Sequence, residues 1–317
     1  MRGDLTLRGE LDEHVELMLD LLNDYDFELA QDSVAEARDQ LDTMVRLGTA
    51  DPEPVDTVED VTIAYDGVAV PARVYAPEGE GPHPTLVFYH GGGFALGSVD
   101  SHDNLCRMVT NRADCVTVSV GYRLAPEHPW PAGIEDAYAA ARWAASNVDQ
   151  WGGDPTRLAV GGDSAGGNFA TVVSMMAAER GMPTIDKQLL LYPSTVYLDP
   201  MQSRAENGDG YFITAHDLVW FVKQYIEDEI DAHHPWAFPM NARDDVLADL
   251  PPAYVMTCGY DPLRDEGIAY AERLRANGVD VTHSNYESMI HGFLNMEDIV
   301  DRCYDGVAEI AAEIRGL

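Results

Sequence analysis

The chain has 317 residues and a formal net charge of −35, from 55 acidic against 20 basic residues. Because nucleic acids and anionic membrane surfaces repel such a charge, the composition argues against both as partners. Hydrophobic residues make up 46% of the chain, which is typical of a globular protein with a large core.

The first fifty residues predict two amphipathic helices. Apolar residues recur at helical spacing between residues 11 and 25, and Ser33 with Glu36 forms a capping box before a second helix that ends at Gly48. The start of the chain is too charged for a signal peptide, and no apolar run reaches the length of a membrane span. We therefore expect a cytoplasmic protein that does not span a membrane.

From about residue 60 the pattern changes to short apolar runs. Two strands are predicted around residues 61–65 and 70–76, joined by a hairpin turn at Asp66 and Gly67. Further strands are predicted at 85–89, 115–120, 158–161, 189–192, 254–258 and 280–285, and helices at about 133–147, 166–180, 267–277 and 296–314. Because these runs are apolar throughout and alternate with helices, they predict an α/β protein with a mostly parallel central sheet and helices on both faces.

Residues 198–250 interrupt this alternation and predict an insertion. They carry no strand pattern, only a helix near 214–227 and acidic loops that contain proline. The adjacent His233 and His234 resemble a metal-binding pair, but neighbouring residues on a helix point apart, so we interpret them as part of a solvated loop. The sequence contains no motif for a metal or a cofactor.

A nucleophile is predicted at the end of the strand at 158–161. The sequence continues Gly162-Asp163-Ser164-Ala165-Gly166 into a helix, which is the G-x-S-x-G pattern in its strand–turn–helix context. In open parallel sheets the chemistry lies beyond the carboxyl ends of the strands. The small flanking residues let strand and helix approach closely, so the turn presents the Ser164 hydroxyl at a helix N-terminus.

A serine nucleophile needs a base that is held by a third group. In this fold the chain order is serine, then an acid, then histidine. Asp261 directly follows the strand at 254–258, and His291 lies between the last strand and the terminal helix. Asp265 and Glu287 are rival acids, but Asp261 lies nearest to the end of its strand.

Three consecutive glycines follow the strand at 85–89. Attack on a carbonyl creates an oxyanion, which backbone N–H groups must stabilise, and the loop after this strand supplies them in this fold. We predict the amides of Gly91, Gly92 and Ala165 as the donors. A phosphate cradle is the competing interpretation, but the glycines lack the G-K-[ST] ending of a phosphate loop.

A loop with three prolines follows the strand at 115–120. Proline fixes the backbone φ angle, so this loop stiffens the surroundings of the glycines. Arg123 lies at the end of the strand, where we hypothesise that it forms an ion pair with Asp163.

Five motifs together resemble the hormone-sensitive lipase family of α/β-hydrolase carboxylesterases, in its GDSAG-type branch. They are HGGGF at 90–94, YRLAPEHPWPA at 122–132, GDSAGGN at 162–168, DPLRDEG at 261–267 and IHGF at 290–293. The resemblance covers roughly residues 60–317. It implies a catalytic triad of Ser164, Asp261 and His291, with Gly91, Gly92 and Ala165 as the oxyanion hole.

The same resemblance implies a helical cap over an α/β-hydrolase core. The expected organisation is an N-terminal helical cap at 1–50, a first part of the core at 51–197, a cap insertion at 198–235 and a second part of the core at 236–317. Residues expected to line the substrate pocket are Phe94, Asn168, Tyr197, Phe212, Trp220 and Phe221.

These features predict a serine carboxylesterase that acts on neutral short- to medium-chain acyl esters through an acyl-enzyme, without a cofactor. No cluster of basic residues stands ready for an anionic substrate. One alternative is a lactonase or amidase that uses the same triad. The other is a non-catalytic binding protein, since the resemblance extends to plant hormone receptors that lack the catalytic histidine; the presence of His291 argues against it.

The charge pattern adds a prediction about the environment. Lys187 and Lys223 are the only lysines among the 20 basic residues. Together with the net charge of −35, this predicts adaptation to high salt, which screens the repulsion between surface carboxylates, and so a halophilic source. The sequence leaves a homodimer open.

Overall fold

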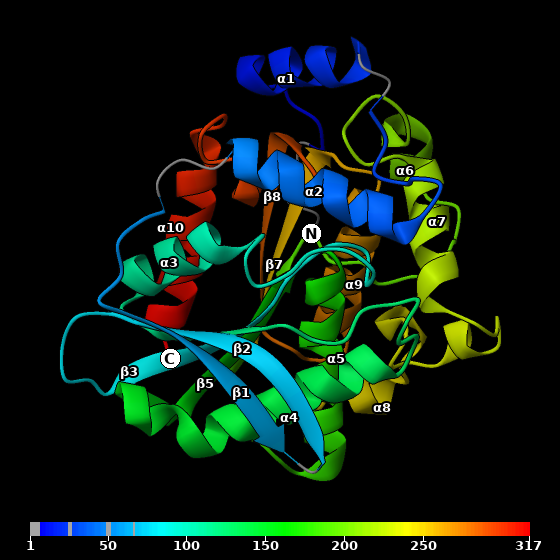
Figure 1. Ribbon diagram of the computed structural model, residues 1–317. Helices are drawn as coiled ribbons and strands as arrows, with labels where there is room; N and C mark the ends of the chain where they lie inside the picture. Colours follow the sequence, from blue (N-terminus) through cyan, green and yellow to red (C-terminus); the bar gives the residue numbers. More distant parts are fainter. Residues whose placement is uncertain (1–6, 25–26, 49–51, 66) are drawn as a thin grey trace.

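The computed structural model describes residues 7–24, 27–48, 52–65 and 67–317. In this part of the chain eight strands form one sheet, in the order β1-β2-β4-β3-β5-β6-β7-β8 (Figure 1). They are β1 (Thr57–Tyr65), β2 (Val68–Ala76), β3 (His83–Tyr89), β4 (Val116–Val120), β5 (Gly153–Asp163), β6 (Lys187–Leu191), β7 (Ala253–Tyr260) and β8 (Val281–Ile290). β2 pairs antiparallel with β1 and β4, and the other neighbours pair in parallel. The predicted mostly parallel sheet is confirmed.

The helices of the described residues cover both faces of this sheet. They are α1 (Glu13–Asp24), α2 (Val34–Gly48), α3 (Asp103–Ala113), α4 (Ala132–Asn147), α5 (Ala165–Arg180), α6 (Gln202–Asn207), α7 (Ala215–Tyr225), α8 (Asp244–Leu247), α9 (Arg264–Ala276) and α10 (Arg302–Arg315). Helices α3 and α10 pack together on one face, and α4 and α5 pack together on the other, with α9 against β7. No helix in these ranges is long and apolar enough to cross a membrane.

The alternation of side chains along the strands builds two separate cores. Every residue of β3 is buried. Val87 and Tyr89 belong to the core beneath α4 and α5, whereas Leu86 and Phe88 belong to the core beneath α3 and α10. Because successive side chains of a strand point to opposite faces, a continuous apolar run is what a strand covered on both sides requires.

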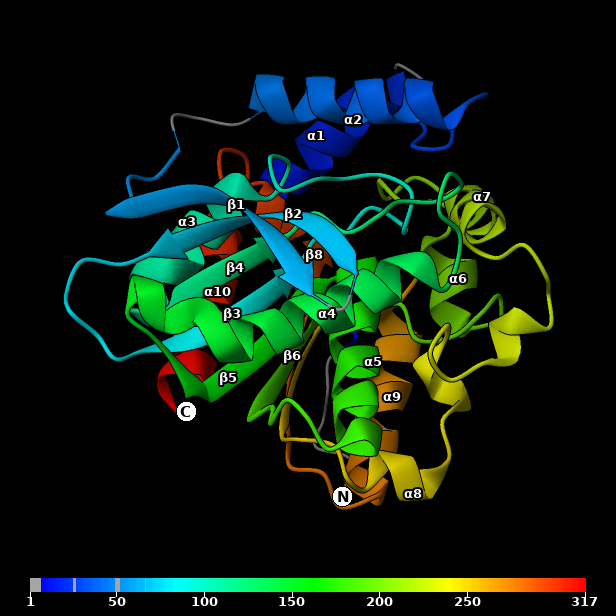
Figure 2. The ribbon, with the colours of Figure 1, turned by 60° about the horizontal axis from the view of Figure 1, so that its bottom comes forward.

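The N-terminal helices form a layer of their own beside the core, as Figure 2 shows. Side chains of α2 and α7 and of the loop after the glycines share a small apolar cluster, which includes Ala37, Leu96 and Phe221. Arg38 of α2 donates hydrogen bonds to two backbone oxygens of the core, Ala95 O at 2.8 Å and Ala125 O at 2.9 Å. The N-terminal segment is thus fixed to the loops at the carboxyl ends of the strands.

The structure differs from the predicted elements mainly at their ends. In addition, helix α3 (Asp103–Ala113) was not among the predicted helices. The strands at 158–161 and 280–285 extend to Gly153–Asp163 and Val281–Ile290, because polar residues also join the ladders. The helix expected at 296–314 begins only at Arg302, after a 3-10 turn at Phe293–Asn295. The antiparallel pairing of β1 with β2 agrees with the predicted hairpin, but Asp66 of its turn lies outside the described residues.

Candidate active site

Ser164 lies in the sharp turn between β5 and α5. Its backbone angles are φ 55° and ψ −117°, a strained conformation for a residue that carries a Cβ atom. A Cβ atom on Gly162 would lie 2.3 Å from Tyr89 O, and one on Gly166 only 1.8 Å from the same atom. Glycine is therefore required on both sides of the serine, because the turn passes directly against the end of β3.

His291 and Asp261 form a buried pair beside this turn. His291 follows β8 and Asp261 follows β7, and the distance from His291 Nδ1 to Asp261 Oδ2 is 2.8 Å. The other carboxylate oxygen of Asp261 accepts a hydrogen bond from the Leu263 amide at 2.7 Å. Burial opposes a charged imidazole, but the Asp261 carboxylate outweighs it and raises the pKa of His291, with smaller contributions from Asp163 and Glu266.

The rival acids make other contacts. Asp265 Oδ1 accepts a hydrogen bond from Arg264 Nε at 2.8 Å, and its Oδ2 accepts one from the Ser203 amide at 2.8 Å. Glu287 is exposed on β8. Of the three candidate acids, Asp261 is the one that contacts His291.

The glycine loop approaches Ser164 with its backbone. Gly92 has a φ of +117°, and a Cβ atom there would lie 2.3 Å from Leu96 O, so the loop requires glycine at this position. The amides of Gly92, Gly93 and Ala165 donate to no group in the described part of the chain. They are free to face a substrate oxygen.

The Gly91 amide is already used, and this corrects the predicted donor set. It donates to Asp163 Oδ1 at 2.8 Å, with His102 Nε2 3.3 Å away. A side chain on Gly91 would collide with the same carboxylate, since its Cβ atom would lie 2.5 Å from Asp163 Oδ2. The role predicted for Gly91 as an oxyanion donor does not fit this arrangement.

Asp163, which precedes the serine, forms a second buried acid–histidine pair. Its Oδ1 lies 3.1 Å from His102 Nε2. Burial opposes ionisation of Asp163, but the nearby His102 and His291 and the Gly91 amide together lower its pKa. The hypothesised partner Arg123 instead binds Asp136 of α4, with 2.7 Å between Arg123 Nη2 and Asp136 Oδ1. The Arg123–Asp163 pair was therefore wrong.

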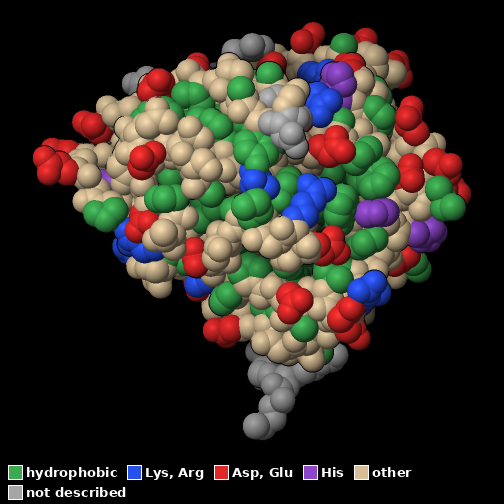
Figure 3. Space-filling model, turned by 90° about the horizontal axis from the view of Figure 1, so that it is seen from below, with side chains coloured by type: hydrophobic (Ala, Val, Ile, Leu, Met, Phe, Trp, Pro, Cys, Tyr) green, Lys and Arg blue, Asp and Glu red, His purple; other side chains and the backbone are tan. Residues whose placement is uncertain are grey.

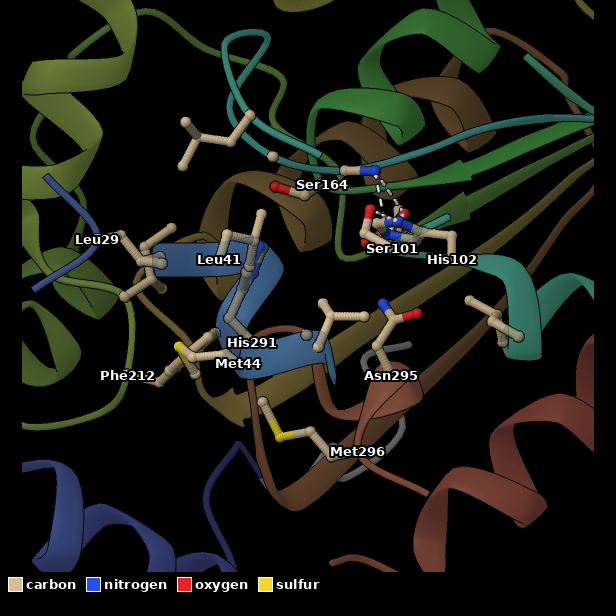
Figure 4. Close-up of a pocket in the computed structure, with 18 of the residues that line it drawn as sticks. Leu29, Leu41, Met44, Ser101, His102, Ser164, Phe212, His291, Asn295 and Met296 are labelled. Atoms are coloured by element: carbon tan, nitrogen blue, oxygen red, sulfur yellow. Dashed lines mark hydrogen bonds and ion pairs between the residues drawn. The ribbon is translucent and has the colours of Figure 1, made fainter. Parts of the chain in front are cut away.

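Two cavities meet at Ser164. The larger, of about 480 Å³, is lined by Ser164, His291, the glycine loop and mainly apolar side chains, and Figure 4 shows Leu29, Leu41, Phe212 and Met296 around it. The smaller, of about 30 Å³, is lined by Ser164 and Ala165 but not by His291. Both are bounded by helix α7 through Phe221.

The predicted pocket residues divide among these cavities. Phe212 lines the larger cavity, Phe94 and Tyr197 line the smaller one, and Phe221 lines both. The two remaining residues line neither, which corrects their predicted role. Asn168 is fully buried and donates to Ser194 O at 3.0 Å and Ala237 O at 2.9 Å, and Trp220 packs edge-on against Phe221.

The comparison with known proteins places this geometry in a family. Residues 86–295 match the family model described as alpha/beta hydrolase fold. The chain belongs to this α/β-hydrolase family. It is 43% identical to Esterase LipI of Mycobacterium tuberculosis, over 95% of this chain and 92% of that protein. Carboxylesterase NlhH of the same organism is 42% identical over 77% of each chain.

A solved structure supports the same relationship. A hyperthermophilic esterase from Pyrobaculum calidifontis superposes with a TM-score of 0.89 at 41% identity, covering 97% of this chain and 99% of that one. With relatives of this kind over most of its length, this α/β hydrolase is a carboxylic ester hydrolase.

Sequence reasoning missed two features of this hydrolase site. His102 lies in a segment without a strand end or motif to mark it, so nothing in the sequence pointed to its contact with Asp163. Met18 and Met44 of the N-terminal helices line the larger cavity, and their spacing marked them only as apolar positions of a helix.

Proposed function

We propose that this protein is a serine carboxylesterase that hydrolyses neutral esters, with Ser164 as nucleophile, His291 as general base and Asp261 as the residue that orients His291. The observation that carries the proposal is the 2.8 Å hydrogen bond between Asp261 and His291, because His291 lines the same cavity as Ser164. Nucleophile, base and orienting acid are the three parts that this chemistry needs.

The reaction proceeds in two acyl transfers. His291 takes the proton of Ser164 as the serine oxygen attacks the ester carbonyl, and the resulting imidazolium is stabilised by Asp261. The imidazolium then protonates the leaving alcohol, which departs and leaves the acyl group on Ser164. A water molecule, deprotonated by His291, attacks this ester, and the acid is released as the serine recovers its proton.

The oxyanion of each tetrahedral intermediate is bound by the amides of Gly92, Gly93 and Ala165. Their lack of acceptors in the described part of the chain supports this assignment. Gly91 takes a positioning role instead, because its amide binds Asp163. Donors that are fixed before the reaction stabilise the developing charge without reorganisation.

Helices α1 and α2 and the insertion at 198–235 act as a cap that shapes the substrate site. Met18, Leu41 and Phe212 of these segments line the larger cavity, which supports apolar substrates of short to medium length. None of the described residues that line it is Lys or Arg, while Asp100 and Glu297 do line it. Neutral esters therefore suit the cavity better than anionic ones.

The surface charge supports a further part of the proposal, adaptation to high salt. Figure 3 shows Asp and Glu side chains spread over the face seen from below, with Lys and Arg in fewer places. With a net charge of −35, repulsion between these carboxylates destabilises the compact chain in dilute salt. We infer that the protein works in a saline medium.

The nucleophile can be tested by trapping. An activated alkyl phosphonate ester should add one phosphonyl group per chain, and mass spectrometry should find it on the peptide that contains Ser164. Ser164→Ala should take up none, whereas Ser146→Ala, on the exposed face of α4, should react like the wild type. A label on another residue would overturn the proposal.

The rates of hydrolysis of p-nitrophenyl acetate and p-nitroacetanilide distinguish an esterase from an amidase. The two compounds differ only in the bond that is broken, which is an ester in the first and an amide in the second.

A further inference from the structure

We propose that the acyl group of the substrate occupies the smaller cavity, so that this esterase is selective for acetyl and propionyl esters whose alcohol is larger and apolar. The proposal rests on the function proposed above and assigns the two sides of the ester to the two cavities. The smaller cavity limits the size of the acyl group, whereas the larger cavity accepts a larger alcohol.

The two cavities differ greatly in size. The smaller cavity measures about 30 Å³ and the larger about 480 Å³. A single water-sized group needs about 10–15 Å³ on this measure, so the smaller cavity admits roughly two or three such groups. That is the size of the methyl group of an acetyl ester or the ethyl group of a propionyl ester.

The general acid lies on one cavity only. His291 lines the larger cavity and is absent from the walls of the smaller one, whereas Ser164 lies on both. The imidazolium must protonate the leaving oxygen, so this oxygen, and the alcohol attached to it, lie on the side of His291. The acyl chain is the remaining substituent of the tetrahedral carbon and points into the smaller cavity, beside Ala165.

The walls of the smaller cavity are anchored to the rest of the protein. Phe221 of α7 lies against the glycine loop so closely that a Cβ atom on Gly93 would approach its ring to 2.2 Å. Helix α7 starts with a capping box, in which Thr214 and Asp217 bind each other's amides, and Asp217 also accepts the Ala30 amide at 2.7 Å. These contacts hold one wall against the catalytic loops.

The opposite wall is fixed from within the core. Val196 and Tyr197 follow β6, and the preceding Thr195 donates its amide to the buried Glu266 at 2.7 Å. Arg204 is the one charged side chain of this cavity's lining, and its guanidinium lies 2.6 Å from Glu266. The cavity thus has anchored walls and no net charge, which suits a small apolar acyl group.

Two isomeric esters, which have the same molecular formula, test the assignment of the two cavities. Hexyl acetate places six carbons on the alcohol and two on the acid, whereas ethyl hexanoate reverses the arrangement. One methylene group that a pocket rejects costs about 10–200-fold in kcat/KM. We expect kcat/KM for hexyl acetate to exceed that for ethyl hexanoate by at least about tenfold, with a steep fall along p-nitrophenyl esters beyond propionate.

A pair of leucine variants locates the cause. Leu218→Ala removes a side chain from the wall of the smaller cavity, and Leu41→Ala makes the same change in the wall of the larger one. The first should raise kcat/KM for ethyl hexanoate relative to hexyl acetate by about tenfold. The second should leave the ratio of kcat/KM for p-nitrophenyl hexanoate to that for p-nitrophenyl acetate within about a factor of two, because both esters carry the same alcohol.

The outcomes separate this inference from the proposed function. Equal or faster hydrolysis of ethyl hexanoate by the wild type would overturn the acyl assignment while leaving an esterase. A rise in kcat/KM for p-nitrophenyl hexanoate relative to p-nitrophenyl acetate in Leu41→Ala but not in Leu218→Ala would show that the two cavities are assigned in reverse. Failure of the wild type to hydrolyse any ester of either series would overturn the function itself.

Discussion

The carboxylate of Asp163 accepts a hydrogen bond from the Gly91 amide, with 2.8 Å between Oδ1 and the amide nitrogen. This bond joins the residue before the nucleophile to the first glycine of the loop that follows β3. His102 also contacts this oxygen, with 3.1 Å between its Nε2 atom and Asp163 Oδ1. The amides of Gly92 and Gly93 are thereby held at a fixed position relative to Ser164.

Replacing Asp163 tests this positioning role. Asp163→Ala removes the acceptor of the Gly91 amide, so we expect kcat to fall by about 10²-fold, as when one oxyanion donor is lost, with a smaller change in KM. Asp163→Asn keeps a carbonyl oxygen that can accept the same hydrogen bond, so its loss of kcat should be much smaller. Equal kcat values for the two variants would contradict the role.

The pH dependence follows from the raised pKa of His291. The neutral imidazole is the base, and a proton on it blocks removal of the Ser164 proton. Since Asp261 and Asp163 raise its pKa above the ordinary 6.5, kcat/KM of the free enzyme should fall as the pH drops, with its midpoint above pH 6.5. Asp163→Asn removes one of the raising charges and should move this midpoint to lower pH. A midpoint below 6.5 in the wild type would contradict the electrostatic account.

Variants of two aspartates near the end of β7 distinguish a residue that orients the base from one that supports the structure. Asp261→Asn favours the wrong tautomer of His291, so kcat should fall by about 10⁴-fold while the thermal unfolding curve changes little. Asp265→Asn loses contacts with Arg264 and Ser203 and should lower Tm more than kcat. Stronger loss of kcat in Asp265→Asn would reassign the acid.

Much of the fold was predictable because each signal is local. Continuous apolar runs such as 85–89 mark strands buried on both faces, and the glycines around Ser164 mark a turn that passes against backbone. Asp261 and His291 could be selected because each follows a strand whose end lies at the same edge of the sheet.

The features of the site that the sequence did not reveal depend on contacts between distant segments. Asp163 and His102 are 61 positions apart, and neither motif nor spacing reveals that the Gly91 amide points to Asp163 rather than to the substrate. Asn168 and Trp220 looked like pocket residues by type, but Asn168 binds the Ser194 carbonyl and Trp220 packs against Phe221. The homodimer stays a prediction, because a single chain does not test it.

Salt should stabilise this protein strongly. The electrostatic screening length is roughly 10 Å at about 0.1 M salt and roughly 3 Å at about 1 M, so molar salt removes most repulsion between surface carboxylates. We expect Tm and esterase activity to rise steeply between 0.1 and 2 M KCl, about the range in which screening and surface exclusion both act. Sucrose at equal osmolality is the control for exclusion alone. A flat Tm across the salt series would contradict adaptation.

Turnover of p-nitrophenyl acetate by Ser164→Ala tests the central claim most directly. The substitution removes the nucleophilic oxygen and leaves the cavity, His291 and the amide donors in place. The account predicts a loss of about 10⁴-fold or more in kcat relative to the wild type, with an unchanged thermal unfolding curve. A folded Ser164→Ala enzyme that keeps a tenth of the wild-type turnover would contradict it, because the acyl-enzyme would then form on another group or not at all.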